Sequence, residues 1–317
     1  MGKEFKNEFT WSFSGHGTFE KCRRLFFESK YGTWNGWKPE APEPARFAYS
    51  LKSLQGFYAW KGDLIHRGIK HHLLTLKRGK EMSKEELVGW VKSTAKREWM
   101  GSLNRCESKY PESKKNVVLT EHYYPDLREK FSAESVMNNV IKDVIIWAEN
   151  YYDSQMVKAI RKVGAAGILT LEDLVSIEIH KTKIWVKLDL AIKTEKNPCL
   201  IIDWKSGKRK EADSRQLSIY SIYAADQWNM PINMIRSVDV YLKEGCDVYD
   251  HHKPTEEASL ADTHQFIRNS IEDMKDNLVG RDQEANVPLP VENWPMCDQD
   301  PTSFTCRNCN FRAKCYR

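Results

Sequence analysis

The sequence contains no apolar run long enough to cross a membrane. Its longest such run, VIIWA at 144–148, falls far short of the roughly 20 residues that a membrane-spanning helix requires. The N-terminal residues also lack the positively charged segment and apolar stretch that mark a secretory signal. These absences exclude an integral membrane protein and predict a soluble, intracellular protein of the cytoplasm.

The sequence also lacks a strong charge of one sign, an internal repeat and a phosphate-binding loop of the form GxxxxGK(S/T). The formal net charge is only +5, from 49 Lys and Arg against 44 Asp and Glu residues. Such a small excess allows a polyanionic partner without requiring one, so local sites must decide. The missing loop excludes an ATP-driven motor of the P-loop type.

Cysteine is present, but its pattern does not indicate disulfides. The eight cysteines are scattered over 317 residues, and without a secretory signal free thiols or a metal site are favoured. Cys306, Cys309 and Cys315, in CRNCNFRAKC, are spaced as ligands of one metal centre. A closed zinc or iron–sulfur site needs a fourth ligand. Cys297, nine positions before Cys306, would complete a compact zinc site, because a short loop costs little entropy to close.

The first half of the chain has mostly helical patterns. Residues 37–47, WKPEAPEPARF, are rich in proline and predict a non-helical linker. From 55 to 159, apolar residues recur at helical spacing. Ser83 and Glu86 match a capping box, which predicts the start of a helix. A further amphipathic helix is predicted over 132–152.

Short β-rich runs follow this helical region. DLVSIEIH, KIWVKLDLAI and PCLIIDWK predict a three-stranded antiparallel meander over 173–205. A helix is predicted over 214–228, a strand over 237–244 and a second helix near 258–279. The predicted fold class is therefore α/β, with a small central sheet after a large helical N-terminal half.

A pair of acidic residues and a lysine lie on these strands. Alternation within LIIDWKSG places Asp203 and Lys205 on one face of a strand. The other face carries the apolar residues Leu200, Ile202 and Trp204. Asp189, in the preceding strand, points away from the apolar residues of WVKLDL. If the two strands pair across the TEKNP connection, Asp189 approaches Asp203, although the sequence does not fix the register.

Two neighbouring carboxylates repel each other and therefore gain from a hard divalent cation such as Mg²⁺ or Mn²⁺. A metal there would polarise a phosphate and acidify a bound water, which Lys205 would orient or deprotonate. Asp189, Asp203 and Lys205 thus fit phosphodiester hydrolysis. The alternative for the same residues is a surface salt bridge on an edge strand.

Other candidates come from the neighbouring elements. Gln216 and Tyr220 are four residues apart in SRQLSIY, so they share a helical face just after the strand. His66, in GDLIHRGIKHHL, shares a face with apolar residues and is either a core histidine or a metal ligand. Glu178, in SIEIH, is either a further carboxylate of the site or a solvent-facing strand residue.

Taken in order, these residues resemble the motifs of the PD-(D/E)XK nuclease superfamily, in its RecB-like branch. The matching stretches are GDLIH, KLDL, IIDWKSG and QLSIY. The resemblance implies a restriction-endonuclease-like core, a small mixed sheet flanked by helices. It also implies that Lys205 is catalytic and that Gln216 and Tyr220 support this lysine and the DNA. The implied metal ligands are His66, Asp189, Asp203 and the main-chain carbonyl of Trp204.

The cysteine tail resembles that of an iron–sulfur subgroup of this branch, which includes the CRISPR-associated adaptation exonucleases and AddB-type nuclease domains. In that subgroup, one cysteine precedes the nuclease core and three follow it. The segment FSGHGTFEKCRRLFFESKYG then makes Cys22 the fourth ligand of a 4Fe-4S cluster, with Cys297 as its rival and Zn²⁺ as the alternative metal. The remaining cysteines are expected to be ordinary buried thiols: Cys106, Cys199 and Cys246.

The resemblance implies a Mg²⁺- or Mn²⁺-dependent deoxyribonuclease, an exonuclease on single-stranded or frayed DNA ends, with protein partners in recombination, repair or defence. The alternative is a non-catalytic nucleic-acid-binding module with a structural zinc or iron–sulfur centre. Trp34 and Trp37 are candidates for base stacking or for the core. A single nuclease domain is expected over 1–317, made of a cysteine segment 1–54, a helical region 55–165, a catalytic region 166–290 and a cluster-binding tail 291–317.

Overall fold

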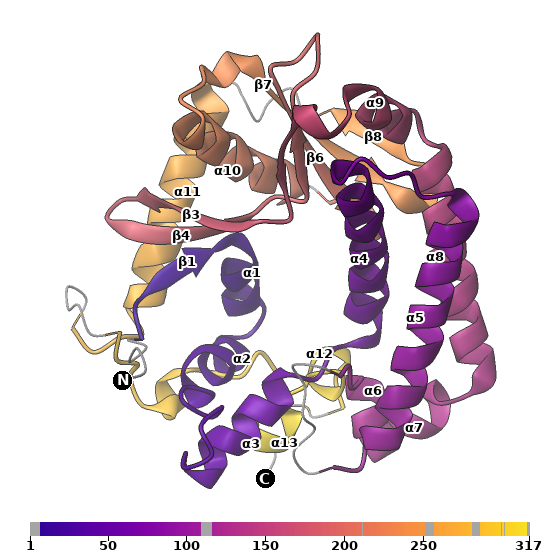
Figure 1. Cartoon of the computed structure of the whole chain (residues 1–317). Coiled ribbons are helices and arrows are strands. Elements are labelled where there is room, and N and C mark those ends of the chain that lie inside the picture. The colour runs from indigo at the N-terminus through magenta and orange to yellow at the C-terminus, as the bar shows by residue number, and fades with distance from the viewer. Residues whose placement is uncertain are drawn as a thin grey trace.

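Two small β-sheets and the helices around them form the protein (Figure 1). The computed structural model describes residues 7–108, 116–210, 212–250, 257–280, 286–298, 300 and 302–315. The larger sheet has the order β2-β5-β6-β7-β8 and the smaller one the order β1-β4-β3. The predicted α/β class, a small mixed sheet with flanking helices, is confirmed. The larger sheet contains β2 (Ile168–Leu171), β5 (Leu190–Ile192), β6 (Cys199–Lys205), β7 (Ile235–Tyr241) and β8 (Asp247–Asp250).

The smaller sheet contains β1 (Thr10–Ser12), β3 (Leu174–Ile179) and β4 (Thr182–Lys187). β1 pairs with β4 in parallel, and β3 pairs with β4 in antiparallel. In the larger sheet, only the central pair β6 and β7 is parallel. Each sheet therefore contains both parallel and antiparallel strand pairs. The chain passes from the smaller sheet to the larger one directly after β4.

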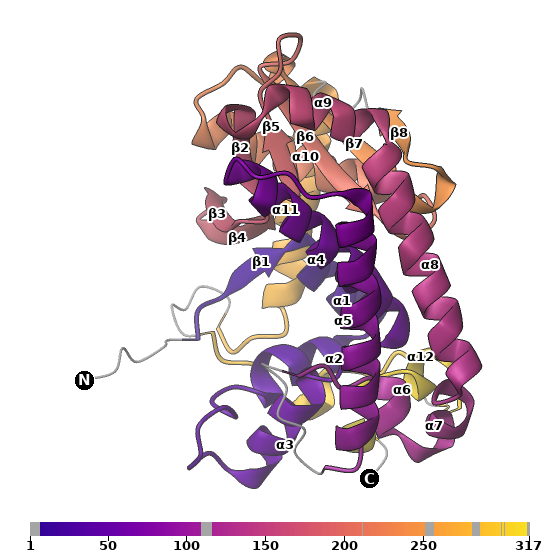
Figure 2. The same ribbon diagram turned by 45° about the vertical axis from the view of Figure 1, so that its right-hand side comes forward.

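Long helices cover both sheets. Their bounds are α4 (Phe57–Lys77), α5 (Lys84–Arg105), α8 (Glu134–Asp153), α10 (Ala212–Gln227) and α11 (Glu257–Lys275). In Figure 2, α5 and α8 run side by side along the outside of α4. The shorter helices are α1 (Phe13–Lys21), α2 (Arg23–Phe27), α3 (Glu43–Lys52), α6 (Thr120–Tyr123), α7 (Pro125–Phe131), α9 (Gln155–Val163), α12 (Phe304–Arg307) and α13 (Arg312–Cys315).

The predicted meander over 173–205 is wrong in one respect. The run KIWVKLDLAI is not one strand, because Leu188 and Asp189 separate β4 from β5. β4 then pairs with β3 in the smaller sheet, whereas β5 pairs with β6 in the larger one. The apolar alternation is nearly continuous through this run, so it does not show where the chain changes sheets.

The predicted linker over 37–47 is also partly wrong. Helix α3 begins at Glu43, and Pro44 lies in its first turn. Proline is tolerated there because the first helical N–H groups have no partner within the helix. The capping box behaves as predicted: Ser83 accepts from the Glu86 N–H, and the Glu86 carboxylate accepts from the Ser83 N–H.

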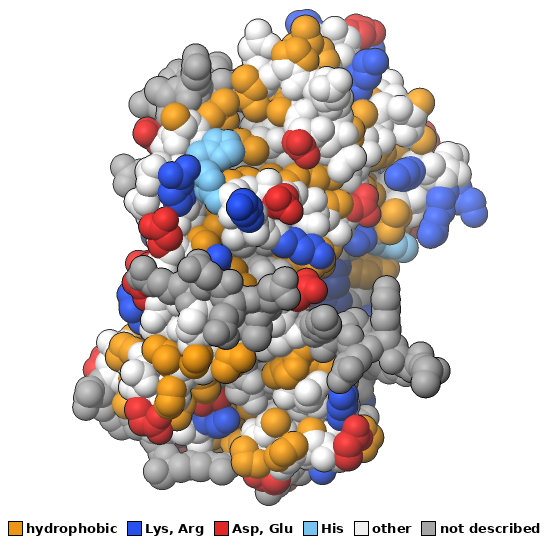
Figure 3. Space-filling model, turned by 90° about the vertical axis from the view of Figure 1, so that its left-hand side faces the viewer, with side chains coloured by type: hydrophobic (Ala, Val, Ile, Leu, Met, Phe, Trp, Pro, Cys, Tyr) orange, Lys and Arg blue, Asp and Glu red, His pale blue; other side chains and the backbone are white. Residues whose placement is uncertain are grey.

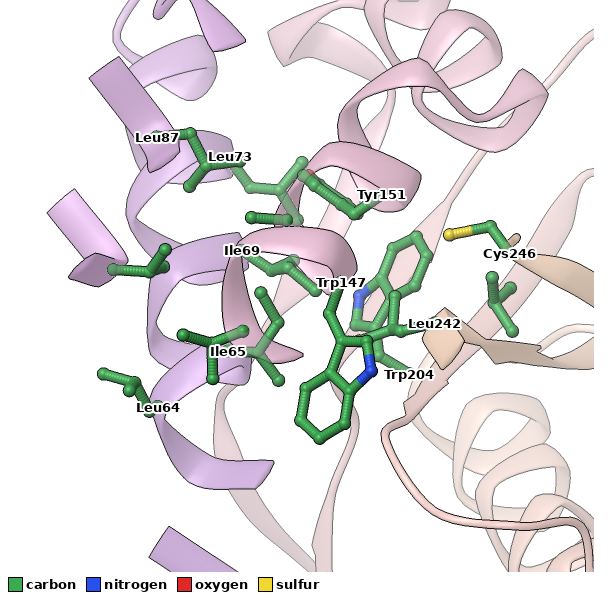
Figure 4. Packing of buried hydrophobic residues seen from close by; sticks show 14 of the residues in the cluster. Leu64, Ile65, Ile69, Leu73, Leu87, Trp147, Tyr151, Trp204, Leu242 and Cys246 are labelled. Atoms are coloured by element: carbon green, nitrogen blue, oxygen red, sulfur yellow. The ribbon is translucent and has the colours of Figure 1, made fainter. Parts of the chain in front are cut away.

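Helix α4 is held against β6 by the larger hydrophobic core. Figure 4 shows Ile65 and Ile69 of α4 turned toward Trp147 of α8 and Trp204 of β6, whereas Leu64 of the same core lies on the far side of the helix. The other face of β6 belongs to a second core, where Cys199 and Ile201 pack with residues of α10. Because strand residues alternate between faces, Asp203 and Lys205 point toward α10.

The two ends of the described chain lie together. In Figure 1, α2 and α3, in indigo, lie beside α12 and α13, in yellow. The Arg24 N–H donates to the Pro295 carbonyl over 3.1 Å, and Lys314 pairs with the buried carboxylate of Glu28 over 2.8 Å. Phe311 joins a third core with residues of α3. The N-terminal and C-terminal segments are thus packed against each other.

No helix in the described ranges is long and apolar enough to cross a membrane. On the face shown in Figure 3, Lys and Arg side chains are interspersed with Asp and Glu, and no large patch of one sign is formed there. This agrees with the small net charge of +5. A polyanion would therefore have to be recognised at local sites.

Candidate active site and cysteine centre

His66 and Asp189 meet where α4 crosses the link between the two sheets. The distance from His66 Nδ1 to Asp189 Oδ2 is 3.4 Å. The same carboxylate accepts a hydrogen bond of 2.9 Å from the main-chain N–H of Trp204. Asp189 is therefore oriented by a helix on one side and by β6 on the other, and it is buried.

Asp203 lies next to Asp189, because Leu190 pairs with Ile202 in the antiparallel β5–β6 register. Its buried carboxylate contacts Lys205 Nζ over 2.6 Å. On the parallel neighbour β7, Asp239 is paired with Asp203 and lies 3.7 Å from Lys205 Nζ. The lysine thus lies within a group of carboxylates that the sequence analysis had only partly identified.

A hydrogen-bond chain joins Lys205 to α10. Lys205 Nζ donates to Gln216 Oε1 over 2.8 Å, and Gln216 Nε2 donates to the Tyr220 hydroxyl over 2.6 Å. Gln216 and Tyr220 share a helical face, as their spacing predicts. The structure therefore brings together all the residues predicted for this site: His66, Asp189, Asp203, Trp204, Lys205, Gln216 and Tyr220.

The proximity of these groups perturbs their protonation. Burial, followed by the negative charge of Asp189, raises the pKa of Asp203 to about 7, although Lys205 opposes the rise. Burial acts to lower the pKa of His66, but the carboxylates of Asp189 and Asp203 outweigh it and raise the value to about 9. The pKa of Asp189 is lowered despite its burial, mainly by His66. Two buried carboxylates whose negative charges repel each other are stabilised by a bound cation.

Glu172 is a further carboxylate that the sequence analysis missed. Its oxygen, a His66 ring nitrogen and an Asp189 oxygen all lie within 4.8 Å of one another. Glu172 occupies the turn between β2 and β3 with φ of 54°, its N–H donates to the Asp189 carbonyl over 3.1 Å, and its carboxylate pairs with Lys187 over 2.6 Å. Glu178, the candidate proposed from sequence, is exposed on β3 opposite Lys183.

A cavity of about 560 Å³ is lined by His66, Asp189, Asp203, Trp204, Lys205, Gln216 and Tyr220. Its volume falls within the range typical of sites for small ligands. One wall carries the candidate metal ligands and Lys205, and the other carries residues of the smaller sheet and of α1, among them Ser12, Phe13, Trp185 and Lys187. The site is therefore open to a ligand larger than a single ion.

Five cysteines surround a second cavity, of about 190 Å³, between the two ends of the chain. They are Cys22, Cys297, Cys306, Cys309 and Cys315. The structure thus places Cys22 with the three tail cysteines, as the resemblance implies. It also places the exposed Cys297 there, in contact with the thiols of Cys22 and Cys306. The three other cysteines are buried elsewhere.

The tryptophans proposed for base stacking lie apart from both cavities. The Trp34 and Trp37 rings meet edge to face at 5.3 Å, and Trp37 is 38% exposed. Within the described ranges, neither residue lines the cavity of the candidate active site. A stacking role at this site therefore cannot come from these two residues.

Two comparisons with known proteins bear on this site, and one of them gives a match. A comparison with curated proteins finds no match. The family model described as the PD-(D/E)XK nuclease superfamily matches residues 10–316. That match includes every candidate residue of the acidic site and all five cysteines around the second cavity. The chain belongs to the PD-(D/E)XK nuclease superfamily.

Proposed function

We propose that the protein is a Mg²⁺- or Mn²⁺-dependent deoxyribonuclease that hydrolyses phosphodiester bonds at the cavity between α4 and β6. One observation carries this proposal. Asp189 directly precedes β5, and Asp203 lies on β6, the strand with which β5 pairs, so the two acidic residues are neighbours. Lys205 Nζ lies 2.6 Å from the Asp203 carboxylate. Superfamily membership supplies the reaction class, since these proteins are generally nucleases that use divalent metals.

The residues of the site have distinct roles in this proposal. A divalent cation held by His66, Asp189, Asp203 and the Trp204 carbonyl would polarise the phosphate and acidify a bound water. Lys205, fixed by Asp203 and Gln216, would hold a phosphate oxygen or the attacking water in position. Tyr220 fixes Gln216 in turn. Because Lys205 is held from two sides, little reorganisation is needed when a substrate binds.

The proposed substrate is single-stranded DNA or a frayed DNA end, cleaved as by an exonuclease. The resemblance to the RecB-like branch supports this narrower assignment. The cavity also supports it, because its wall extends well beyond the acidic residues and could accommodate a nucleic-acid strand.

The cysteine cavity is proposed to hold a structural 4Fe-4S cluster through Cys22, Cys306, Cys309 and Cys315. Four thiolates on one zinc ion at about 2.3 Å lie only about 3.8 Å apart. In the described part of the chain, the only triad of His, Cys, Asp or Glu ligand atoms within 4.8 Å is that of His66, Glu172 and Asp189. No three of the described sulfurs around the cavity therefore lie within 4.8 Å of one another, which suits a cluster better than a single zinc ion.

Such a cluster would connect the two ends of the chain. Its ligands come from both sides of the contact between α2 and the C-terminal tail. Closing a loop of nearly the whole chain removes much entropy from the unfolded state. The proposed cluster is therefore structural, and it stabilises the frame that carries the active site.

The catalytic proposal is tested with protein purified without oxygen and incubated with Mn²⁺ or Mg²⁺ and labelled DNA. Lys205→Ala and Asp203→Ala should abolish cleavage. Lys142→Ala, which removes an exposed lysine on α8, should leave it unchanged. Undiminished cleavage by either site variant would show that the proposed site is wrong. A wild type that binds DNA but cleaves no nucleic acid would support the non-catalytic alternative instead.

The cysteine site is tested by iron, sulfide and zinc analysis and by the visible spectrum. Cys22→Ser is expected to lose iron and colour, whereas Cys297→Ser is expected to keep both. The reverse pattern would assign Cys297 as the fourth ligand. Stoichiometric zinc without iron would replace the cluster by a zinc site.

A further inference from the structure

The smaller sheet has one buried face and one exposed face. The buried face of β3 and β4, with Ile177, Ile184 and Val186, packs into the same core as α10. On the opposite face of β4, Lys183 and Lys187 are exposed and Trp185 is half-buried. This face therefore presents a large aromatic ring between two lysines.

The neighbours of Trp185 on both adjacent strands are small. It is paired with Ser176 on β3 and with Ser12 on β1. A serine on each side cannot cover an indole ring, whereas a large apolar residue at either position would. Lys183 Nζ lies over the ring at 4.2 Å from its centroid, a cation–π contact that keeps a positive charge next to the ring. Because Lys183 occupies one face of the indole, a flat ligand would stack on the face that this lysine leaves free.

Trp185 also belongs to the active-site cavity. The cavity wall includes Ser12, Trp185 and Lys187 from the smaller sheet as well as His66 from α4. Trp185 precedes Asp189 by four residues, and the strand ends at Lys187, so the two are at most roughly 13 Å apart at about 3.3 Å per strand residue. A strand of nucleic acid bound at Asp189 would reach the indole.

We propose that Trp185 is a stacking site for an unpaired base of a nucleic-acid strand whose phosphate lies at the Asp189–Asp203 pair. This inference rests on the proposed nuclease function and specifies its substrate as single-stranded. A base can stack on an indole only when it has left its duplex, and such stacking tolerates any base because every base has a π-face. Lys183 and Lys187 supply positive charge for the flanking phosphates.

The test compares a base-bearing strand with a strand that has none. Fluorescence anisotropy with Mn²⁺, in a full-length Lys205→Ala background that is expected to keep the cation without cleaving, measures the Kd for a labelled 12-nucleotide oligothymidine and for an abasic strand of the same length. Trp185→Ala should weaken binding of the oligothymidine by about 5- to 150-fold and change binding of the abasic strand by less than about twofold. Trp185→Phe should retain most of the affinity.

Trp37→Ala is the matched control, because it removes an exposed indole outside the cavity, and it should weaken binding of neither strand. An equal loss on both strands for Trp185→Ala would show a structural effect and overturn the stacking site, as would no loss on either. A separate measurement of DNA cleavage by the wild type with Mn²⁺ distinguishes failure of the nuclease proposal from failure of the stacking site. A wild type that cleaves DNA while Trp185→Ala binds normally refutes only the stacking site, and a wild type that neither binds nor cleaves refutes both.

Discussion

Replacing Glu172 by glutamine tests whether this unpredicted carboxylate belongs to the proposed metal site. Its oxygen lies within 4.8 Å of ligand atoms from His66 and Asp189, and its side chain is only 8% exposed. Glutamine keeps the size and shape of the side chain but removes the negative charge. Any change in metal affinity would therefore report the charge rather than a packing defect.

The magnitude follows from the positions of Glu172 and Lys187. A unit charge roughly 5 Å from a divalent cation contributes about 7 kcal/mol at an effective dielectric constant of about 20. Lys187, 2.6 Å from Glu172 and 53% exposed, repels the same cation from farther away, by about 5 kcal/mol at roughly 7 Å. Once its partner is lost, Lys187 would turn into solvent and this repulsion would disappear. The net loss is about 2 kcal/mol, or roughly 30-fold in Kd.

Isothermal titration calorimetry with Mn²⁺ and no DNA measures this loss directly. Glu178→Gln is the matched control, because that glutamate is exposed on the adjoining strand and should not alter the Kd. Lys187→Met should tighten Mn²⁺ binding, since it removes a repulsive charge. If Glu172→Gln binds Mn²⁺ within twofold of the wild type while Asp189→Asn binds it weakly, Glu172 has no part in the metal site.

Three further predictions concern stability. Burial, with Arg161 nearby, lowers the pKa of His72 to about 4 from its ordinary 6.5, so the unfolded chain binds a proton that the folded one does not. The contribution of His72 to the free energy of unfolding should therefore fall by about 3 kcal/mol as the pH drops from about 6.5 to 4, and urea titrations should show a flatter profile for His72→Asn. Ser83→Ala, which removes the capping box of α5, should cost about 1 kcal/mol in urea unfolding at pH 7.5. Leu64→Ala should lower the free energy of unfolding by about 2–5 kcal/mol in the same assay, because this leucine is fully buried. Met100→Ala is the control: its side chain is 51% exposed, and the loss should be less than about 0.5 kcal/mol.

Local patterns were sufficient wherever local interactions decide the structure. The apolar spacing around His66 predicted a helix, and α4 runs from Phe57 to Lys77. The pair Ser83 and Glu86 predicted the helix start because both partners of a capping box lie within one turn. The pairing of the strands around Asp203 was predictable because only a short connection separates β5 from β6.

The features that escaped prediction depend on long-range contacts. Glu172 reaches the site because a residue with positive φ turns the chain back beside Asp189, and nothing in the stretch TLEDL indicates that conformation. Asp239 lies next to Asp203 because β7 pairs with β6 in parallel across a helical crossover, and sequence alone does not give that register. The contact of Cys297 with Cys22 spans most of the chain.

The change of sheets after β4, which the predicted meander missed, is also what positions the candidate site. If KIWVKLDLAI formed one strand, Asp189 would lie within a single sheet instead of at the link between two. The interruption at Leu188–Asp189 places this carboxylate where the two sheets adjoin. The same short segment then carries Trp185 and Lys187 on the exposed wall of the cavity. An interruption of a strand loses hydrogen bonds between strands, and such departures from regular structure are expected at functional sites. Here the interruption connects the proposed metal centre to the proposed stacking surface.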